Sequence, residues 1–397
     1  MNKIICGTSV LLISGAVMLS ACSMNLGPET LPSTVVTTET TETEPTETSA
    51  TIRPELTDPF SVALVTESVV EKNGQLSIKG KSLLNSKGED VVLKGMTSYG
   101  IHDCVDFFNS DIIRTLAEDW GSDVLRIAIS GDGADSAFMK DPDKYFDPIC
   151  KICDMCISQG IYVIIDWDIH YDEAATENSK AAVDFFTRLS AIYATSPNII
   201  YGVSNYDATP EEGVKDEWTK LIAPFASDVI TAIRTNSPEA IVIVGAPNNG
   251  LDVDTIGKAK LKYDNVAYGC RLFSGNQKQE QRDKIKTAID SGLCVFITEW
   301  GLTMNDSKGG VCYLESDRWS QFFEENKISW CNYGIGSFIN NDSNALMLLS
   351  GKYNNDQKAS HWPDGLISKS GLYAREQILK GKVASETSAT ESSAETT

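Results

Sequence analysis

A carboxylate stands directly after an apolar stretch in the sequence Cys294-Val295-Phe296-Ile297-Thr298-Glu299-Trp300-Gly301. The β-branched and aromatic residues predict a buried strand that ends at Glu299. Burying an unpaired carboxylate costs free energy, so Glu299 needs a reason for its position. Two interpretations are open. Glu299 is either a catalytic carboxylate at the mouth of a parallel barrel, where active sites lie at the C-terminal ends of strands, or a structural residue that hydrogen-bonds a neighbouring loop.

Polar and aromatic side chains also end most of the other predicted strands. An arginine keeps a nearby carboxylate ionised, asparagine holds a sugar hydroxyl, and tryptophan and tyrosine faces stack on sugar rings. This mixture favours a carbohydrate site over a phosphate site, which would need clustered lysines and arginines or a glycine-rich backbone. In chain order the residues are Arg126, Asp166, Trp167, Asp168, Asn205, Tyr206, Asp207, Arg271, Phe273, Trp300, Asn332 and Tyr333.

Eight short apolar segments supply these strand ends, and helical segments separate most of them. Such alternation predicts a parallel sheet, and eight units in roughly 300 residues predict a closed (β/α)8 TIM barrel of the α/β class. An open, doubly wound sheet would need a glycine-rich loop after its first strand, which residues 95–100 do not provide. The predicted strands cover residues 91–96, 124–129, 162–166, 199–204, 241–244, 266–272, 295–299 and 328–334, and the predicted helices cover 111–119, a stretch ending near 159–160, 179–194, 215–234, 277–291, 317–326 and 372–379.

The composition divides the chain into one folded domain and two tails. Residues 31–50 and 384–397 consist mostly of Thr, Glu, Ser, Pro and Ala, which bury too little apolar area to offset their ordering entropy, so both are predicted to be disordered. The predicted parts are a signal peptide (1–21), a linker (22–60), a barrel (61–382) and a tail (383–397). A hairpin at residues 76–78, with its turn at 85–88, is expected to cap the barrel.

The net charge of −21 argues against a nucleic-acid partner, whose phosphates would repel the chain. We expect a monomer.

The N-terminus has the pattern of an export signal. Lys3 is followed by an apolar stretch over residues 4–19 and then by Leu19-Ser20-Ala21-Cys22. This resembles a bacterial lipoprotein signal, which implies that Cys22 carries lipid and that the protein is anchored to the outer face of the cell membrane. A plain signal peptide and an uncleaved anchor are the alternatives. We expect no other membrane-spanning segment.

The cysteines raise the question of a metal site. Export permits disulfides among the eight that follow Cys22, and their pairing stays open. Cys150, Cys153 and Cys156 have spacings that suit a metal ligand set, but i, i+3, i+6 spacing also follows one face of a helix, where cysteine is an ordinary small buried residue. We favour the helix face and expect neither a metal ion nor a cofactor.

Sequence motifs over residues 76–382 point to one family. Leu93-Lys94-Gly95-Met96, Leu125-Arg126-Ile127-Ala128, Ile164-Ile165-Asp166-Trp167, Ile297-Thr298-Glu299-Trp300-Gly301 and Ile328-Ser329-Trp330-Cys331-Asn332 occur in the order and spacing of glycoside hydrolase family 5. The chain resembles its bacterial endo-β-1,4-glucanase branch. The resemblance implies a retaining glycosidase on a (β/α)8 barrel, acting on β-glucan, with two catalytic carboxyl groups roughly 5 Å apart.

Residue by residue, the resemblance places Glu299 at the nucleophile position, Arg126 at the arginine that orients it, and Asn205 at the asparagine that binds the sugar 2-hydroxyl. Several other positions differ from the family. Tyr206 stands where the family has its acid/base glutamate. Asp168 replaces a histidine, Arg271 and Phe273 replace a histidine and a tyrosine, Tyr333 replaces a tryptophan and Tyr99 replaces a histidine. We take Tyr99, Trp167, Asp168, Arg271, Phe273, Trp300 and Tyr333 as candidate sugar-binding residues.

The substitution at Tyr206 bears directly on activity. A phenol has a pKa near 10, whereas an effective general acid at neutral pH is tuned to about 6–7, and losing acid/base assistance costs typically about 10²–10⁴-fold in rate. One hypothesis is a surface-anchored β-glucan-binding protein with lost or much reduced hydrolysis. The other is an active retaining β-glycosidase that uses a different carboxylate, namely Asp207, Asp168, Asp172 or Glu173.

Overall fold

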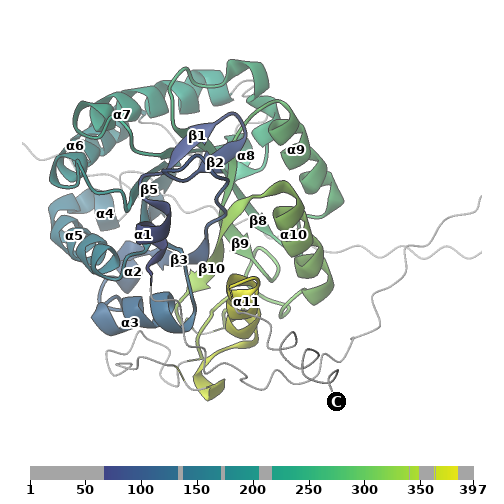
Figure 1. The fold of residues 1–397 in the computed structure, drawn as a ribbon. Coiled ribbons are helices and arrows are strands. Elements are labelled where there is room, and N and C mark those ends of the chain that lie inside the picture. The colour runs from purple at the N-terminus through teal and green to yellow at the C-terminus, as the bar shows by residue number, and fades with distance from the viewer. Residues whose placement is uncertain are drawn as a thin grey trace, which may run out of the picture. The chain divides into compact units, whose positions relative to one another are not determined.

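The computed structural model describes residues 67–132, 137–170, 175–204, 217–338, 340–347, 362 and 364–382. Within these residues, parallel strands close into a barrel in the order β10-β3-β4-β5-β6-β7-β8-β9, and helices surround it (Figure 1). This confirms the predicted (β/α)8 fold. The barrel strands are β3 Lys94–Gly100, β4 Val124–Asp132, β5 Tyr162–His170, β6 Ile199–Val203, β7 Val242–Gly245, β8 Val266–Phe273, β9 Val295–Gly301 and β10 Ser329–Ile335.

The longer helices form the outer layer, and each predicted helix is present. Two of them contain a π-helical turn: Thr115–Asp119 continues α3, and Trp218–Ile222 precedes α7. The helices are α1 Val69–Asn73, α2 Ile101–Cys104, α3 Ser110–Arg114, α4 Ala137–Lys140, α5 Pro142–Ser158, α6 Ala175–Ile192, α7 Ala223–Asn236, α8 Pro247–Gly250, α9 Gln279–Asp290, α10 Tyr313–Asn326 and α11 Lys369–Leu379, with short 3-10 turns at Val253–Thr255, Gly257–Ala259 and Asp364–Leu366.

Most barrel strands continue past their predicted C-terminal ends. β4 and β5 stay in register from Val124 opposite Tyr162 to Asp132 opposite His170, because backbone pairing does not stop where polar side chains begin. Trp167, Asp168, Phe273 and Trp300, which were predicted to lie at or beyond strand ends, are therefore inside strands. Since side chains alternate along a strand, neighbours such as Glu299 and Trp300 point to opposite sides of the barrel wall.

The N-terminal hairpin is present, but its turn was predicted in the wrong place. β1 Ser77–Lys79 pairs with β2 Ser82–Leu84, so the connection is Gly80–Lys81, with Gly80 at a φ of 61°. Two-residue hairpin turns favour such positive φ angles. The predicted turn at 85–88 is a separate one that leads to the bridge between Leu84 and Asp90. Its cause is Asn85, whose side-chain oxygen accepts hydrogen bonds from the backbone of Lys87 and Glu89, an arrangement typical of asparagine turns.

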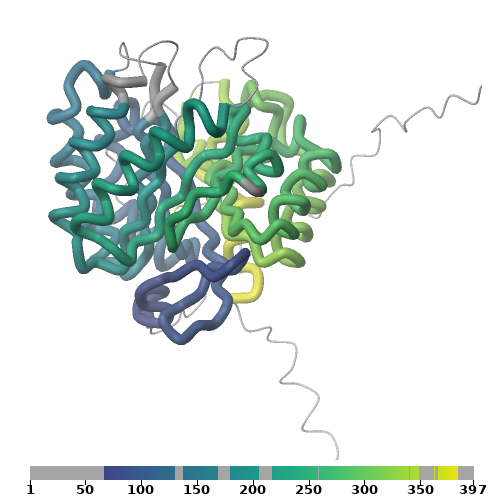
Figure 2. Tube along the Cα trace, turned by 90° about the horizontal axis from the view of Figure 1, so that it is seen from above, coloured from purple at the N-terminus to yellow at the C-terminus, as the bar shows by residue number. Residues whose placement is uncertain are grey.

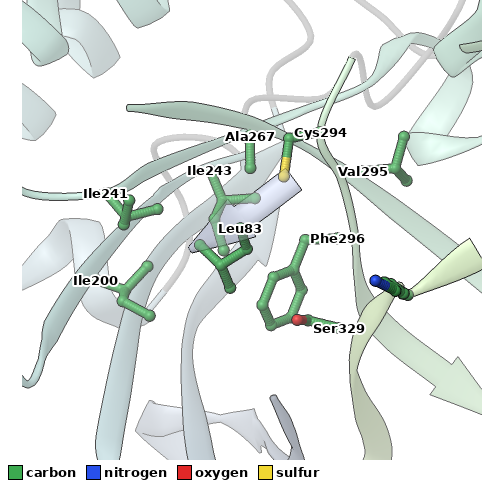
Figure 3. Close-up of a pocket in the computed structure, with 10 residues that line it drawn as sticks. Leu83, Ile200, Ile241, Ile243, Ala267, Cys294, Val295, Phe296 and Ser329 are labelled. Carbon is green, nitrogen blue, oxygen red and sulfur yellow. The ribbon is translucent and has the colours of Figure 1, made fainter. Parts of the chain in front are cut away.

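The hairpin closes the end of the barrel at which the strands begin, as Figure 2 shows in purple. Leu83 reaches between the first residues of several strands and is surrounded by Ile200, Ile241, Ile243 and Phe296 (Figure 3). The cavity left there has a volume of about 10 Å³, which is room for no more than about one water molecule. This end of the barrel is thus packed apolar core, and any chemistry must occur at the opposite end.

The three closely spaced cysteines lie along α5, as the helix-face interpretation predicts. Cys153 and Cys156 are fully buried, and Cys150 is half-buried. Burial raises the pKa of the Cys153 and Cys156 thiols above the ordinary value. The described part of the chain contains no group of three or more histidine, cysteine or acidic residues placed to hold a metal ion.

None of the helices among the described residues is both long enough and apolar enough to cross a bilayer.

Truncating Leu83 tests the role of the hairpin as a plug. We expect Leu83→Ala to lower the free energy of unfolding by about 2–5 kcal/mol, because a buried side chain is lost and the cavity grows. Lys79→Ala, on the exposed side of the same hairpin, should change it by no more than about 0.5 kcal/mol. Urea denaturation of the two variants measures the difference, and equal small losses in both would show that the hairpin does not contribute to the core.

Candidate active site

A buried arginine organises the open end of the barrel. Arg126, on β4, contacts side chains from three other strands and is fully buried. Its Nε donates to Asp166 Oδ2 at 2.7 Å, its Nη1 to Glu299 Oε1 at 2.7 Å and its Nη2 to Asp168 Oδ2 at 3.2 Å. Nη1 also donates to the Thr97 hydroxyl at 2.9 Å. These carboxylates raise the pKa of Arg126 well above its ordinary value, because together they outweigh the desolvation that would lower it.

Asp166 lies deepest in this group, and a glycine on the next strand makes space for it. A Cβ atom at Gly202 would approach Asp166 Cγ to 2.4 Å, so a larger residue there would displace the carboxylate. Ser204 donates a second hydrogen bond to Asp166 Oδ2 at 3.2 Å. Burial, followed by repulsion from Asp168, raises the pKa of Asp166 despite the contact with Arg126. Desolvation therefore outweighs the ion pair at this carboxylate.

A second arginine covers the carboxylates from the solvent side. Arg271, on β8, places Nη1 3.3 Å from Asp168 Oδ1 and Nε 3.1 Å from Glu299 Oε2. Its side chain is 20% exposed, against 3% for both carboxylates. We call Arg126, Arg271, Asp166, Asp168 and Glu299 the ion-pair cluster.

The loop after β7 holds Arg271 in this place. Asn249 Oδ1 accepts a hydrogen bond from Arg271 Nη1 at 3.2 Å. Asn249 has a φ of 55°, in the left-handed region that asparagine tolerates better than most residues. The next residue, Gly250, has a φ of 85°, and a Cβ there would lie 2.9 Å from the backbone nitrogen of Arg271. The close approach of loop and strand thus depends on this Asn-Gly pair.

Both oxygens of Glu299 face a guanidinium group. Oε1 accepts the hydrogen bond from Arg126, and Oε2 lies at ion-pair distance from Arg271, although the direction gives no hydrogen bond. The buried carboxylate therefore has charged partners, as both interpretations of Glu299 require. Neither oxygen of Glu299 is both exposed and free of a charged partner.

Three aromatic rings lie beside the ion-pair cluster. The Tyr99 and Tyr333 ring centroids are 4.8 Å apart, and those of Phe273 and Tyr333 are 5.7 Å apart. Phe273 lies across Gly301, where a Cβ would approach the ring to 2.0 Å. Burial, and then the nearby Glu299 charge, raises the pKa of Tyr333. Phe273 and Tyr333 are half-buried, whereas Tyr99 is buried and donates to Asn344 Oδ1 at 2.9 Å. Phe273 and Tyr333 therefore provide the accessible aromatic surface.

The two tryptophans expected to bind sugar are not part of this group. Trp167 is fully buried against Phe138 and Phe185 in the helical layer. Trp300 is fully buried too, packs on Phe323 and donates to the Ser274 hydroxyl. Both precede or follow an inward-pointing carboxylate, so alternation along the strand directs them outward. The expectation that they stack on a sugar is wrong for this structure.

Other candidate residues lie outside the described residues, namely Asn205, Tyr206, Asp207, Asp172 and Glu173. The sequence did not assign an individual role to several side chains that shape the cluster: Asp166 appeared only in the group of strand-end residues, and Thr97, Gly202 and Asn249 did not appear. Asp166 shares a strand face with Asp168 through i, i+2 spacing, so the pattern already contained that signal. Thr97, Gly202 and Asn249 gave no such signal, because their contacts depend on strand register and loop geometry.

The fold and the carboxylates gathered at the C-terminal ends of the strands define a barrel of the glycoside hydrolase type. The model of the cellulase family, glycosyl hydrolase family 5, matches residues 84–338. An endoglucanase from Clostridium saccharobutylicum is 33% identical over 316 residues, which cover 80% of this chain and 67% of the relative. Endoglucanase N from Pectobacterium atrosepticum is 30% identical over 324 residues, covering 81% and 69%. The chain thus belongs to the cellulase family, and it spans about two thirds of these relatives' length.

Solved structures agree with this assignment. A structure from Cytophaga hutchinsonii aligns with a TM-score of 0.71 at 29% identity, covering 80% of this chain and 98% of that one. The catalytic domain of an endoglucanase from Thermobifida fusca aligns with a TM-score of 0.69 at 22% identity, covering 78% and 99%. At that identity the second match supports the fold alone.

The charge state of Asp166 gives a pH-dependent prediction. Because its pKa is raised in the folded state, its contribution to stability is present below the unfolded-state pKa and is lost as pH rises through the folded-state pKa. Asp166→Asn removes this loss. The free energy of unfolding of the variant minus that of the wild type should therefore rise as the pH increases above about 4, the ordinary pKa of an aspartate. Denaturation at several pH values measures the difference. A difference that stays constant over this range would contradict the raised pKa of Asp166.

Proposed function

We propose that this member of the cellulase family binds β-glucan at the cell surface and has lost most or all of its hydrolytic activity. The observation that carries the proposal is the engagement of Glu299, the residue at the nucleophile position, by two arginines. A retaining nucleophile must direct a carboxylate oxygen at the anomeric carbon of the sugar. Here Arg271 stands over the oxygen that Arg126 leaves available, and Asp168 and Asn249 hold Arg271 in turn.

The acid/base side of the reaction supports the same proposal. Tyr206 stands at the acid/base position in the sequence, and a phenol with a pKa near 10 is a poor proton donor at neutral pH. Asp168, one of the alternative donors, is buried, and both of its oxygens contact arginines. A proton on Asp168 would have to displace one of these contacts, so Asp168 is a poor substitute for the missing glutamate.

The ligand class rests on the family and on the aromatic rings. The relatives are named endoglucanases, which makes β-glucan the first ligand to test. Phe273 and Tyr333 present partly exposed rings next to the ion-pair cluster, and an aromatic face suits the apolar face of a sugar ring. Sugar binding does not require the proton transfers of hydrolysis, which the arginine contacts in the ion-pair cluster hinder. In this proposal the protein therefore keeps sugar binding after it has lost catalysis.

A variant that restores both lost groups tests the chemistry. We expect Tyr206→Glu/Arg271→His to hydrolyse an unactivated β-glucan oligosaccharide about 10²–10⁴-fold faster than Tyr206→Gln/Arg271→His, because only the first pair provides an acid at position 206. A reducing-sugar assay measures both rates. Wild type should bind soluble β-glucan in an isotherm while releasing little reducing sugar.

One outcome would overturn this proposal in favour of an active glycosidase. It is rapid hydrolysis by the wild type that Glu299→Gln abolishes at an unchanged melting temperature. The melting temperature is the necessary control, because removing one partner of a buried ion pair costs about 3–5 kcal/mol of stability and could inactivate the protein by unfolding it. The amide of Glu299→Gln should cost less than this, since it keeps part of the hydrogen bonding.

We also propose that Cys22 anchors the protein to the outer face of the cell membrane. The support is the sequence Leu19-Ser20-Ala21-Cys22 after an apolar stretch, followed by a Thr- and Glu-rich segment. Linkers of such composition span roughly 30 Å or more over 35 residues, enough to hold the barrel away from the lipid.

Substituting the anchor residue tests this second proposal. We expect Cys22→Ala to release the protein into the medium or to leave its signal unprocessed, because no thiol remains to carry lipid. Cell fractionation and immunoblotting measure the distribution. Cys6→Ala, within the apolar part of the signal, serves as the control and should stay in the membrane fraction. Unchanged membrane association of Cys22→Ala would contradict lipid anchoring.

A further inference from the structure

The turn after β7 reaches the ion-pair cluster from outside it. This turn, α8 Pro247–Gly250, has a left-handed backbone at both of its central residues, with a φ of 53° at Asn248 and 55° at Asn249. Residues other than glycine seldom adopt this conformation, and two neighbours keep it only where the surrounding structure fixes them. The turn has such contacts on both of its sides.

One contact comes from the segment that leads into α7. Glu217 Oε2 accepts a hydrogen bond from the backbone nitrogen of Asn248 at 2.7 Å. The residue after Glu217 is Trp218, which is buried and packs against Tyr268 of β8. The Trp218 indole also donates to Ala259 O at 2.8 Å. The Glu217 carboxylate is thus carried by a firmly packed part of the helical layer, and it fixes the first left-handed residue of the turn.

The second contact comes from α9, at the other end of the turn. Gln281 Nε2 donates to Leu251 O at 2.6 Å. Lys284 Nζ lies 3.0 Å from Asp252 Oδ1, so an ion pair holds the next residue as well. The turn is therefore attached on both sides, and Asn249 lies between the two attachments.

Arg271 meets this fixed turn at two points. Its Nη1 donates to Asn249 Oδ1 at 3.2 Å. A Cβ atom at Gly250 would lie 3.1 Å from Arg271 Cγ, so the aliphatic part of the arginine rests against the turn. In this orientation Arg271 Nε lies 3.1 Å from Glu299 Oε2. The turn thus fixes both the course of the side chain and the position of its guanidinium group.

We propose that Asn249 and Glu217 are positioning residues that keep Arg271 in this place. Through Arg271 they control how reactive the Glu299 carboxylate is, although neither belongs to the ion-pair cluster. The Arg271 side chain is 20% exposed, so water can solvate a guanidinium that has lost the turn. Glu299 Oε2 would then lose a charged partner. The inference rests on the proposed function, because it explains what keeps the shielding arginine beside the nucleophile position.

Covalent labelling of Glu299 tests the proposal. The probe is an epoxypropyl β-cellobioside, whose epoxide is opened by a carboxylate oxygen. An ester bond forms, and the released alkoxide takes a proton from water. Mass spectrometry of the full chain and of its peptides gives the labelling rate at saturating probe. Glu299→Gln identifies the labelled residue and should carry no adduct at that position.

Substitutions of Asn249 separate its side chain from its backbone. Asn249→Gly should label about three- to tenfold faster than the wild type, because a hydrogen bond to the charged guanidinium is lost. Glycine adopts the left-handed conformation readily, so the turn is kept. The matched control, Asn249→Asp, keeps an acceptor oxygen and should label no faster than the wild type.

Substitutions of Glu217 test the more distant contact in the same way. Glu217→Ala should accelerate labelling, because the backbone nitrogen of Asn248 loses its partner and the turn is released. Glu217→Gln keeps an oxygen for that nitrogen and should label like the wild type. Melting temperatures of all variants show that the labelled protein is folded.

A double-variant cycle distinguishes positioning from a merely structural role. Arg271→Ala should label at least about tenfold faster than the wild type, because Glu299 loses a charged partner. Adding Asn249→Gly to Arg271→Ala should bring no further gain, since the residue through which Asn249 acts is absent. A structural role of Asn249 would change the labelling rate with or without the arginine.

Three results would overturn the inference. If Arg271→Ala accelerates labelling but Asn249→Gly and Glu217→Ala do not, the inference fails and the proposed function stands. A further gain from Asn249→Gly in the absence of Arg271 would have the same meaning. If Arg271→Ala itself brings no acceleration, Arg271 does not shield Glu299, and the proposed function loses its main support together with the inference.

Discussion

The structure depends on the balance of charge around Arg126. A fully buried guanidinium is tolerated only when carboxylates surround it, and Asp166, Asp168 and Glu299 do so from neighbouring strands. Each partner constrains another part of the barrel: Gly202 must stay small to admit Asp166, and β9 must keep its register to deliver Glu299. Removing Arg126 would leave these buried carboxylates with less compensating charge, which is costly in free energy.

The fold was predictable from the sequence because most strands and helices can be recognised from the pattern of apolar and polar residues within each segment. Apolar segments such as 162–166 and 295–299 are flanked by helical stretches, and eight repeats of that pattern leave few alternatives to a closed barrel. The strand ends were less predictable. Backbone pairing between β4 and β5 continues through Asp166 and Asp168, because the neighbouring strand supplies partners whatever the side chains are. The hairpin turn was misplaced for a similar reason: both Gly80 and Asn85 favour turns, and only strand pairing selects between them.

The candidate site was predictable to the extent that it follows the alternation of a strand. The pairing of Arg126 with Glu299 could be inferred, since each stands at a strand end and carries the opposite charge. The misassignment of Trp167 and Trp300 came from treating residues next to a carboxylate as part of the same surface, whereas consecutive side chains point to opposite faces. The hydrogen bond from Arg271 to Asn249 could not be predicted from the sequence, because it depends on the backbone conformation of the loop after β7.

The presence of Arg126 and Glu299 is therefore weak evidence for catalysis, because a buried ion pair is also kept for stability. The presence of Arg271 is stronger evidence, and it argues against catalysis. Three carboxylates facing one arginine would leave two negative charges in excess at the open end of the barrel. Such an excess leaves a carboxylate oxygen available for a ligand. Arg271 removes half of it and occupies the remaining side of Glu299 and Asp168. Compensating the charge of a buried carboxylate stabilises the folded barrel and makes that carboxylate a weaker nucleophile. The proposed loss of hydrolysis therefore needs no change in the barrel, because Tyr206 at the acid/base position and Arg271 beside Glu299 account for it within the site.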